Sequence, residues 1–368
     1  MCISIKVQNS YEQPLHAMTM DYARNLRRER KKLLKSDILD KAKKAILDFI
    51  DDEDQVELSY GRKYAYILRL RRIAGVLQDS FNNPTKEQIK DFMSSFRKTM
   101  VRWGSGKEHN PSDNSNQAYQ VTLKKFYKWY LGNNEDYPDC VKWIKITTTK
   151  RSKETKPKQG ITQQEFVGML NSAMNPRDRA LLSLLYGSGC RISELLGLDI
   201  KDIEIENDSA DIIVCGKTGV RTVTVPGDTL PYLQEWLENH PVYDPNAPLF
   251  TRMDGDVRER MTYEQAHSML RKVSKRAGIK RRIYPHLFRH TRATLLSTEL
   301  TEPVLEKVMG WVHGSRMSQV YVHLNDKTVK NQVLKAYGIE VKDDHSLSST
   351  NAKPCPRCHT KLPSFAKI

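Results

Sequence analysis

The sequence predicts a mainly α-helical protein that carries one small β-hairpin or sheet and divides into two domains. Apolar residues recur at helical spacing from about residue 36 to residue 145. Further along, two runs rich in β-branched residues flank the turn Gly216-Lys217-Thr218-Gly219, and helical spacing resumes beyond them. A polar, charged stretch separates the two patterned regions, and 368 residues are enough for two domains.

Residues 1–35 are expected to form a basic N-terminal arm. Residues 24–35 hold seven basic residues and one acidic residue, and no clear period precedes them. Such a run either touches a polyanionic backbone or forms the solvated face of a helix.

Residues 36–148 are expected to form an all-helical domain with a basic surface. Ser36 is a plausible N-cap for its first helix. A later helix, near residues 115–131, carries a stripe of aromatic residues that is typical of core packing. The basic residues on its other faces remain available for phosphates, and they are Lys124, Lys125 and Lys128.

Residues 149–160 are polar and charged with one proline, which predicts an interdomain linker. Residues 161–340 are expected to form a second, α+β domain. Capping boxes predict helices that begin after Thr162 and Thr262. Apolar spacing predicts the remaining helices, near residues 176–187, 230–237, 303–309 and 326–336.

The chain has 60 basic and 44 acidic residues, a net charge of +16 that favours a polyanionic partner through counterion release. No apolar run approaches the length of a membrane span, and residues 1–6 lack the apolar stretch of a signal peptide. A cytoplasmic protein without membrane contact is therefore expected. Four of the six cysteines stand among apolar neighbours and are expected to be buried, namely Cys2, Cys140, Cys190 and Cys215.

One stretch, residues 284–294, concentrates groups that suit a phosphate. Pro285 fits the first turn of a helix, and His286, Arg289 and His290 then fall at i, i+3 and i+4 on one helical face. Imidazole beside guanidinium suits an anion with a reacting oxygen. Nine basic residues and no acidic residue lie between positions 271 and 292, which makes further candidates for nucleic-acid contacts of Arg281, Arg282 and Arg292.

Groups elsewhere in the sequence supply the rest of a phosphoryl-transfer site. Two guanidiniums, those of Arg191 and Arg289, can grip the nonbridging oxygens of one phosphodiester and stabilise the charge that builds on them. The phenol of Tyr321 can act as a nucleophile. Lys217, on the hairpin, can give a proton to an alkoxide leaving group. Trp311 adds an indole N–H.

These motifs, in this order and spacing, resemble the tyrosine recombinase (site-specific integrase) family, and especially its archaeal-type members. Gly189-Cys190-Arg191-Ile192-Ser193-Glu194 looks like the family's first arginine box, and Gly216-Lys217-Thr218-Gly219 with Arg221 looks like its hairpin lysine. His286-Leu287-Phe288-Arg289 matches its His-x-x-Arg box. Met309-Gly310-Trp311, followed by Tyr321-Val322-His323, looks like its last box and nucleophile. The segment around Phe126–Trp129 is similar to the family's core-binding domain.

The resemblance implies a helical core-binding domain and an α+β catalytic domain that close as a C-shaped clamp on double-stranded DNA carrying a specific recombination site. It also implies strand exchange without metal, ATP or cofactor, by four protomers on two duplexes. Tyr321 would attack the scissile phosphate and leave a 3′-phosphotyrosine. Arg191 and Arg289 would hold the phosphate and Lys217 would be the general acid. Two further catalytic residues are implied: His286 would assist proton transfer, and Trp311 would donate its indole N–H to a phosphate oxygen or buttress the pocket. Glu194, which would brace Arg191, and His290 would have supporting roles.

Two features depart from the family pattern. Trp311 stands where a second histidine is usual, so His313 competes with it for that role. The spacing from Trp311 to Tyr321 is ten residues, where bacterial members commonly have nine. Tyr321 remains the expected nucleophile, and Tyr337 is expected to serve packing.

The C-terminal segment 341–368 is expected to be a polar tail. It contains Cys355-Pro356-Arg357-Cys358-His359, which is half of a zinc ribbon. Cys355 and Cys358 are therefore candidate zinc ligands. The alternatives are an unstructured tail and a haem attachment sequence, and the lack of an export signal speaks against the haem.

Two other classes of function share these features. One is a non-catalytic DNA-binding or architectural protein on the same scaffold, which would bind DNA without forming a covalent adduct. The other is a type IB topoisomerase, which would use the same attack to relax supercoils.

Overall fold

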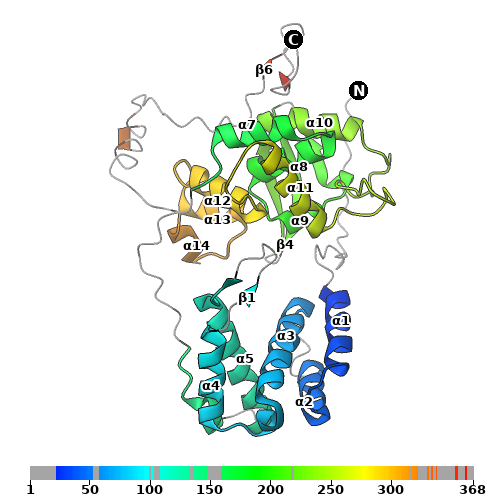
Figure 1. Ribbon diagram of the computed structural model, residues 1–368. Coiled ribbons are helices and arrows are strands. Elements are labelled where there is room, and N and C mark those ends of the chain that lie inside the picture. The colour runs from blue at the N-terminus through cyan, green and yellow to red at the C-terminus, as the bar shows by residue number, and fades with distance from the viewer. Residues whose placement is uncertain are drawn as a thin grey trace. The chain divides into compact units, whose positions relative to one another are not determined.

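The structure is a computed structural model. It describes residues 22–52, 58–98, 101–102, 108–132, 136–146, 159–206, 208–216, 219–314 and 316–321, with a few positions nearer the C-terminus (330, 333–334, 337, 353–354 and 361–362). The chain divides into two compact units, one formed by Asp21–Lys156 and one that contains Pro157–Ile368 (Figure 1).

The N-terminal unit is helical and is built around α3 (Tyr60–Leu77), which contacts α1, α2, α4 and α5. Its core is aromatic, with Phe49, Phe81, Phe126 and Tyr127 fully buried. The other elements of the unit are α1 (Tyr22–Leu34), α2 (Asp40–Asp51), η2 (Gln78–Asn82), α4 (Lys86–Lys98), α5 (Asp113–Leu131), α6 (Asp139–Lys142) and the antiparallel pair β1 (Val101–Arg102) and β2 (Glu108–His109).

Two expectations for this unit are corrected. The basic run expected to belong to an arm over residues 1–35 is helical in α1 and packs into the core, because Leu26 and Leu33 lie one heptad apart on a single face and are both buried. The charges of this run therefore occupy the other faces of a packed helix. Ser36 does not cap α2, whose N-cap is Leu39; its hydroxyl instead donates to the carbonyl oxygen of Leu33 at 2.6 Å.

Replacing Phe126 by alanine is expected to destabilise the helical unit by about 3–5 kcal/mol, the usual range for removing a buried phenylalanine ring. The Phe126 ring lies 5.4 Å from the ring of Phe49 and 5.2 Å from that of Phe81, so truncation leaves a cavity among aromatic side chains. Urea unfolding of the two chains measures the difference. Val121→Ala, at a partly exposed position of the same helix, is the matched control and should change stability by under about 0.5 kcal/mol.

The C-terminal unit combines helices with a small sheet. Its elements are α7 (Gln163–Ser172), α8 (Pro176–Ser188), α9 (Ile192–Leu196), η3 (Ile200–Asp202), β3 (Ile203–Ile205), β4 (Ser209–Gly216), β5 (Gly219–Pro226), η4 (Gly227–Thr229), α10 (Leu230–Glu238), α11 (Tyr263–Arg276), α12 (Pro285–Leu296), α13 (Glu302–Met309) and α14 (Arg316–Gln319). Nearer the C-terminus, β6 (Lys353–Pro354) pairs with β7 (Lys361–Leu362).

Helix α8 is the centre of this unit and contacts α7, α9, α10, α12 and β5 (Figure 1). Nearly all of its side chains are buried. Local sequence sets both of its ends. The Asn175 side chain accepts from the backbone N–H of Asp178 with Pro176 at the first position, and Gly189 ends the helix in the left-handed conformation at φ +64°. The chain that leaves Gly189 then enters α9 at Arg191.

The sheet is an antiparallel meander with strand order β3-β4-β5. Ile212 of β4 pairs with Ile203 of β3 and with Val223 of β5, and the hairpin closes at the pair Gly216 and Gly219. The described elements thus confirm the predicted fold class, mainly α with one small sheet. Both predicted capping boxes, at Thr162 and Thr262, are also present.

The expectations for the cysteines, the linker, the last helix and the tail have different outcomes. Cys140 and Cys190 are buried as expected, but Cys215 is exposed because it lies one pair away from the turn end of the hairpin. Most of the expected linker at 149–160 and of the expected helix at 326–336, together with Cys2 and most of the tail, lies outside the described residues. Among the helices that the structure describes, none is both long and apolar enough to cross a bilayer.

Candidate active site

Arg191 is positioned by the turn that joins α8 to α9. Its backbone N–H donates to Glu194 Oε2 at 2.8 Å, and its Nη1 donates to Glu194 Oε1 at 2.7 Å. Glu194 lies in the first turn of α9, so both groups are held by one short helix. The Arg191 guanidinium remains partly exposed, while the carboxylate that braces it is 2% exposed.

Arg289 reaches the same place from the second turn of α12. Its side chain is buried, its Nη1 donates to the carbonyl oxygen of Gly189 at 3.1 Å, and its Nη2 donates to the carbonyl oxygen of Met309. These carbonyls stand at the C-terminal ends of α8 and α13, where helix carbonyls lack partners within the helix and attract cations. Burial, together with the neighbouring charge of Arg191, lowers the pKa of Arg289 to about 10, so it remains a cation at neutral pH.

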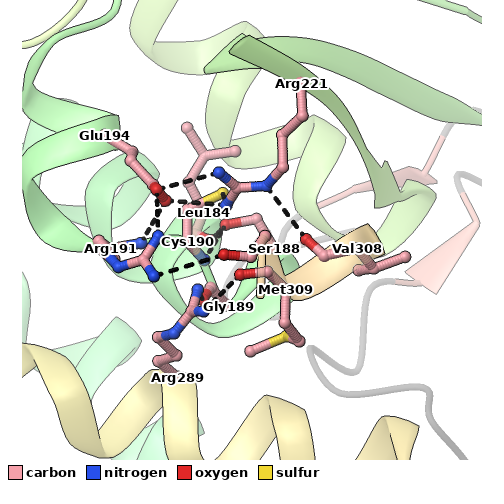
Figure 2. A network of polar contacts seen from close by, with 11 residues as sticks. Leu184, Ser188, Gly189, Cys190, Arg191, Glu194, Arg221, Arg289, Val308 and Met309 are labelled. Atoms are coloured by element: carbon pink, nitrogen blue, oxygen red, sulfur yellow. Dashed lines mark hydrogen bonds and ion pairs between the residues drawn. The ribbon is translucent and has the colours of Figure 1, made fainter. Parts of the chain in front are cut away.

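The two arginines converge on one pair of glycine turns. Arg191 Nη2 lies 3.5 Å from the carbonyl oxygen of Gly310, the residue after Met309, and Gly310 ends α13 in the left-handed conformation. In Figure 2 the guanidiniums of Arg191 and Arg289 lie close together on one side of the Gly189 turn. Two cations thus share one polar site, as the sequence led us to expect.

Glu194 also binds a third guanidinium, that of Arg221, which the sequence motif placed beside the hairpin lysine without a role of its own. Arg221 of β5 donates through Nη1 to Oε1 at 3.0 Å and through Nη2 to Oε2 at 2.9 Å (Figure 2). Burial acts to raise the pKa of Glu194, but the bonds from Arg221 and Arg191 outweigh it and the net shift is downward. The carboxylate is therefore ionised at neutral pH.

Tyr321 is linked to Arg289 through the ring of Trp311. Its ring stacks on that of Trp311, with centroids 5.3 Å apart and an interplanar angle of 12°, and Trp311 in turn has the Arg289 guanidinium carbon 5.8 Å from its ring centre. The backbone is fixed by Ser297, whose hydroxyl donates to the Tyr321 carbonyl oxygen at 3.1 Å. Burial raises the pKa of Tyr321, against the opposing effect of Arg289, so the phenol is protonated at neutral pH.

The two histidines of α12 occupy different places. His290 Nδ1 is hydrogen-bonded to the Tyr321 hydroxyl. His286, in the first turn of the helix, is more exposed; partial burial and the charges of Arg289 and Arg191 lower its pKa, which keeps the ring neutral at pH 7. The imidazole that contacts the phenol is therefore the one that sequence reasoning placed in a supporting role.

His313 does not compete with Trp311. Its Nδ1 lies 2.9 Å from Glu306 Oε2, and its side chain is 90% exposed. Trp311, by contrast, lies between Arg289 and Tyr321. Trp311, the residue after Gly310, is therefore the one that lies in the site.

The candidates for DNA contacts on and near α12 lie in different environments. Arg282 is exposed. Arg281 pairs with Glu165 and donates to the carbonyl oxygen of Gln159 at 2.8 Å, so it ties the start of the unit to α12. Arg292 is only 8% exposed, because position 292 shares the buried face of α12 with Arg289, and its Nε and Nη1 have no partner among the described residues. The expectation of a surface contact at Arg292 is therefore wrong.

In the helical unit, the three candidate lysines of α5 are half-buried. Lys124 Nζ lies 4.1 Å and Lys128 Nζ 5.3 Å from the centre of the Tyr137 ring, on one side of the helix. Lys125 faces Tyr66 at 5.8 Å instead, and burial lowers its pKa. The aromatic stripe beside them packs in the core, as predicted.

Three further candidates, Lys217, Cys355 and Cys358, lie outside the described residues. Within the part of the chain that is described, no group of three or more potential metal ligands gathers. The suggested zinc site at the two cysteines stays a prediction.

Comparison with known proteins gives matches to one family. Residues 160–328 match the model of the phage integrase family. The tyrosine recombinase XerA of Saccharolobus solfataricus is 26% identical over 255 residues, which are 68% of this chain and 78% of the relative. The tyrosine recombinase XerC of Escherichia coli O157:H7 is 26% identical over 206 residues, 55% of this chain and 67% of the relative.

Solved structures show the same fold. The crystal structure of the XerH site-specific recombinase bound to its difH substrate has a TM-score of 0.55 at 21% identity, and the match covers 85% of this chain and 94% of that one. A lambda integrase tetramer bound to a Holliday junction has a TM-score of 0.52 at 15% identity over 91% of this chain and 84% of that one.

Proposed function

We propose, from the match of residues 160–328 to the phage integrase family and the similarity to tyrosine recombinases, that this chain is a site-specific tyrosine recombinase and that Tyr321 is the nucleophile with which it cuts and rejoins DNA. One observation carries the assignment: the Tyr321 ring stacks on Trp311, whose ring lies against Arg289, and Arg289 converges with Arg191 at the ends of α8 and α13. The family requires no cofactor for this chemistry.

The reaction is a balanced exchange of phosphodiester bonds. The phenolic oxygen of Tyr321 bonds to the scissile phosphorus while the bond to the 5′ oxygen breaks, which leaves a 3′-phosphotyrosine and a 5′-hydroxyl. Arg191 and Arg289 donate to the nonbridging oxygens, where charge grows in the transition state. Lys217 gives a proton to the departing 5′ oxygen, and a 5′-hydroxyl from the partner strand later reverses the attack.

His290 takes the proton from Tyr321. Its Nδ1 is already hydrogen-bonded to the phenol, and the raised pKa of Tyr321 makes a proton acceptor necessary at neutral pH. His286, whose pKa is lowered by burial and by the charges of Arg289 and Arg191, is a neutral imidazole and can donate to the phosphate from its protonated ring nitrogen.

His290→Gln is expected to slow cleavage about 10²-fold at pH 7, the lower range for loss of a general base. Because burial places the pKa of Tyr321 above its usual value of 10, the rate of the variant should rise steadily between pH 8 and 10, as more phenolate forms without help. The wild-type rate should rise much less. Single-turnover cleavage across this pH range measures both, and parallel profiles would argue against His290 as the acceptor.

Lys217→Met is expected to slow cleavage of an ordinary phosphodiester about 10²-fold, as for loss of a general acid. A substrate with sulfur in place of the bridging 5′ oxygen should restore the rate, because a thiolate leaves without a proton. Lys201→Met, on the exposed η3 segment, is the matched control and should cleave both substrates like wild type. An equal loss on both substrates would remove Lys217 from this role.

Double-stranded DNA with a specific recombination site is the proposed partner, and it places the activity in the cytoplasm or nucleoid. Strand exchange joins two duplexes, so the working assembly is four protomers, as in the lambda integrase tetramer on a Holliday junction. The similarity to XerA supports a member of the archaeal type. That a mobile element carries the gene stays a prediction. Sedimentation of the chain with two duplexes tests the stoichiometry.

The proposed function is tested with nicked duplexes drawn from the DNA that flanks the encoding gene. A nick next to the cleavage site lets a short fragment diffuse away, so the covalent intermediate accumulates. The chain should become attached to the 3′ end through a tyrosine that maps to residue 321. A salt-sensitive complex without an adduct would instead indicate an architectural protein, and relaxation of supercoils by monomers would indicate a topoisomerase.

A further inference from the structure

Glu194 is the meeting point of four segments of the C-terminal unit. It lies in α9 and accepts hydrogen bonds from the backbone N–H and the guanidinium of Arg191. It also accepts two hydrogen bonds from the guanidinium of Arg221 in β5. A Cβ atom added to Gly216, the last residue of β4, would collide with Glu194 Oε1. The end of the hairpin that carries Lys217 therefore rests directly on this carboxylate.

We infer that Arg221 is a positioning residue for the proposed cleavage: it holds Glu194 so that the carboxylate braces Arg191 without neutralising it. This inference rests on the proposed function and names a further residue needed for it. A carboxylate paired with Arg191 alone would cancel much of the positive charge that the phosphate must meet. Arg221 takes both carboxylate oxygens in a bidentate pair, the geometry in which guanidinium binds carboxylate most strongly.

The charges of the network support this role. Among the described residues of this network, Arg191, Arg221 and Arg289 face one anion, Glu194, which leaves an excess of two positive charges. The attacked phosphodiester gains a second negative charge on its nonbridging oxygens in the transition state, which this excess matches. Cys190, whose sulfur lies 3.9 Å from Arg221 Nη2, does not reduce this positive charge. Burial raises the pKa of its thiol to about 11, so the thiol is neutral at pH 7.

Arg221 also fixes the turn that carries Trp311. Its Nε donates to the carbonyl oxygen of Val308 at 3.3 Å, and its guanidinium packs so closely on Gly310 that an added Cβ there would lie 2.7 Å from Arg221 Cζ. Figure 2 shows the side chain between Glu194 and the end of α13. One guanidinium thus ties the hairpin, the first arginine and the indole turn to a common position.

A purely structural ion pair would behave differently. Breaking such a pair would lower stability, and cleavage would fall only as far as the folded fraction falls. A positioning role predicts a loss of rate in folded, DNA-bound protein. It also predicts that the loss depends on Glu194 and on the charge of the phosphate.

The test compares the full-length chain with Arg221→Gln, Glu194→Gln and the double variant, on a nicked duplex whose cleavage site has been mapped with wild type. At saturating protein, Arg221→Gln should cleave about 10²-fold more slowly, the scale of one lost electrostatic contribution, with a Kd for DNA within about threefold of wild type because phosphate contacts elsewhere set affinity. The double variant should cleave about tenfold faster than Arg221→Gln, because removing the carboxylate restores the excess of two charges.

A second substrate reports on charge directly. When a methyl group replaces one nonbridging oxygen of the scissile phosphate, the transition state carries one negative charge fewer, and the Arg221→Gln defect should shrink about tenfold. The Arg252→Gln variant, which breaks the exposed pair with Glu259, should match wild type on both substrates. Arg221→Lys, which keeps the charge, serves if the glutamine variant does not fold; it should lose less, about tenfold, and its loss should also shrink on the methyl substrate.

The inference is overturned if Arg221→Gln cleaves within about threefold of wild type, if the double variant is no faster than the single one, or if the methyl substrate leaves the defect unchanged. Absence of any adduct with the wild-type chain would overturn the proposed function itself. The two failures are therefore distinguishable.

Discussion

The Tyr321→Phe chain is expected to form no covalent adduct with a nicked duplex, while its affinity for the same duplex stays within about twofold of wild type. The substitution removes only the oxygen that attacks phosphorus and bonds to His290. Stacking of the ring on Trp311 does not need that oxygen, and the bond from Ser297 goes to the backbone carbonyl. Denaturing electrophoresis measures the adduct, and a native gel shift measures binding.

Tyr337→Phe provides the matched control, because that residue is 80% exposed. It should form the adduct at the wild-type rate. An adduct that persists in Tyr321→Phe, with its attachment mapped to another tyrosine, would contradict the assignment of the nucleophile.

Arg289→Lys is expected to slow cleavage about 10³-fold, although the positive charge is retained. The guanidinium donates at once to the carbonyl oxygens of Gly189 and Met309. An ammonium group on a flexible stem cannot reproduce that fork, so it cannot hold both helix ends and a phosphate oxygen together. DNA affinity should fall less than about tenfold, because most phosphate contacts lie elsewhere.

Arg258→Lys, at an exposed position to which no role in DNA contact is assigned, is the control and should retain cleavage within about threefold of wild type. Single-turnover cleavage at saturating protein separates the loss of rate from any loss of binding. A rate for Arg289→Lys within about tenfold of wild type would mean that charge alone suffices, and that the fork geometry plays no part.

The elements that could be predicted from sequence are those whose ends are encoded locally. Thr162 and Thr262 each form both bonds of a capping box, and Pro176 and Gly189 delimit α8, so these boundaries follow from a few neighbouring residues. The basic run of residues 24–35 misled because its charges outnumber its apolar residues. The spacing of Leu26 and Leu33, one heptad apart, was the signal of a packed helix.

Which groups meet in the site depended on tertiary packing that no local pattern encodes. His286 and His290 share a face of α12, but only the position of Tyr321 decides which of them bonds to the phenol. The sequence signal for Arg221 was weaker. It precedes Val223 and Val225 on the inward face of β5, and a charge on the buried side of a strand requires a partner.

A structure of the Tyr321→Phe chain bound to an intact duplex tests the account most directly, through the distances from two guanidiniums to one phosphate. We expect nitrogens of Arg191 and Arg289 to lie about 2.7–2.9 Å from nonbridging oxygens of the same scissile phosphate, with the aromatic ring at position 321 opposite the 5′ oxygen. Guanidiniums bound to different phosphates, or a residue 321 remote from the phosphate they share, would contradict it.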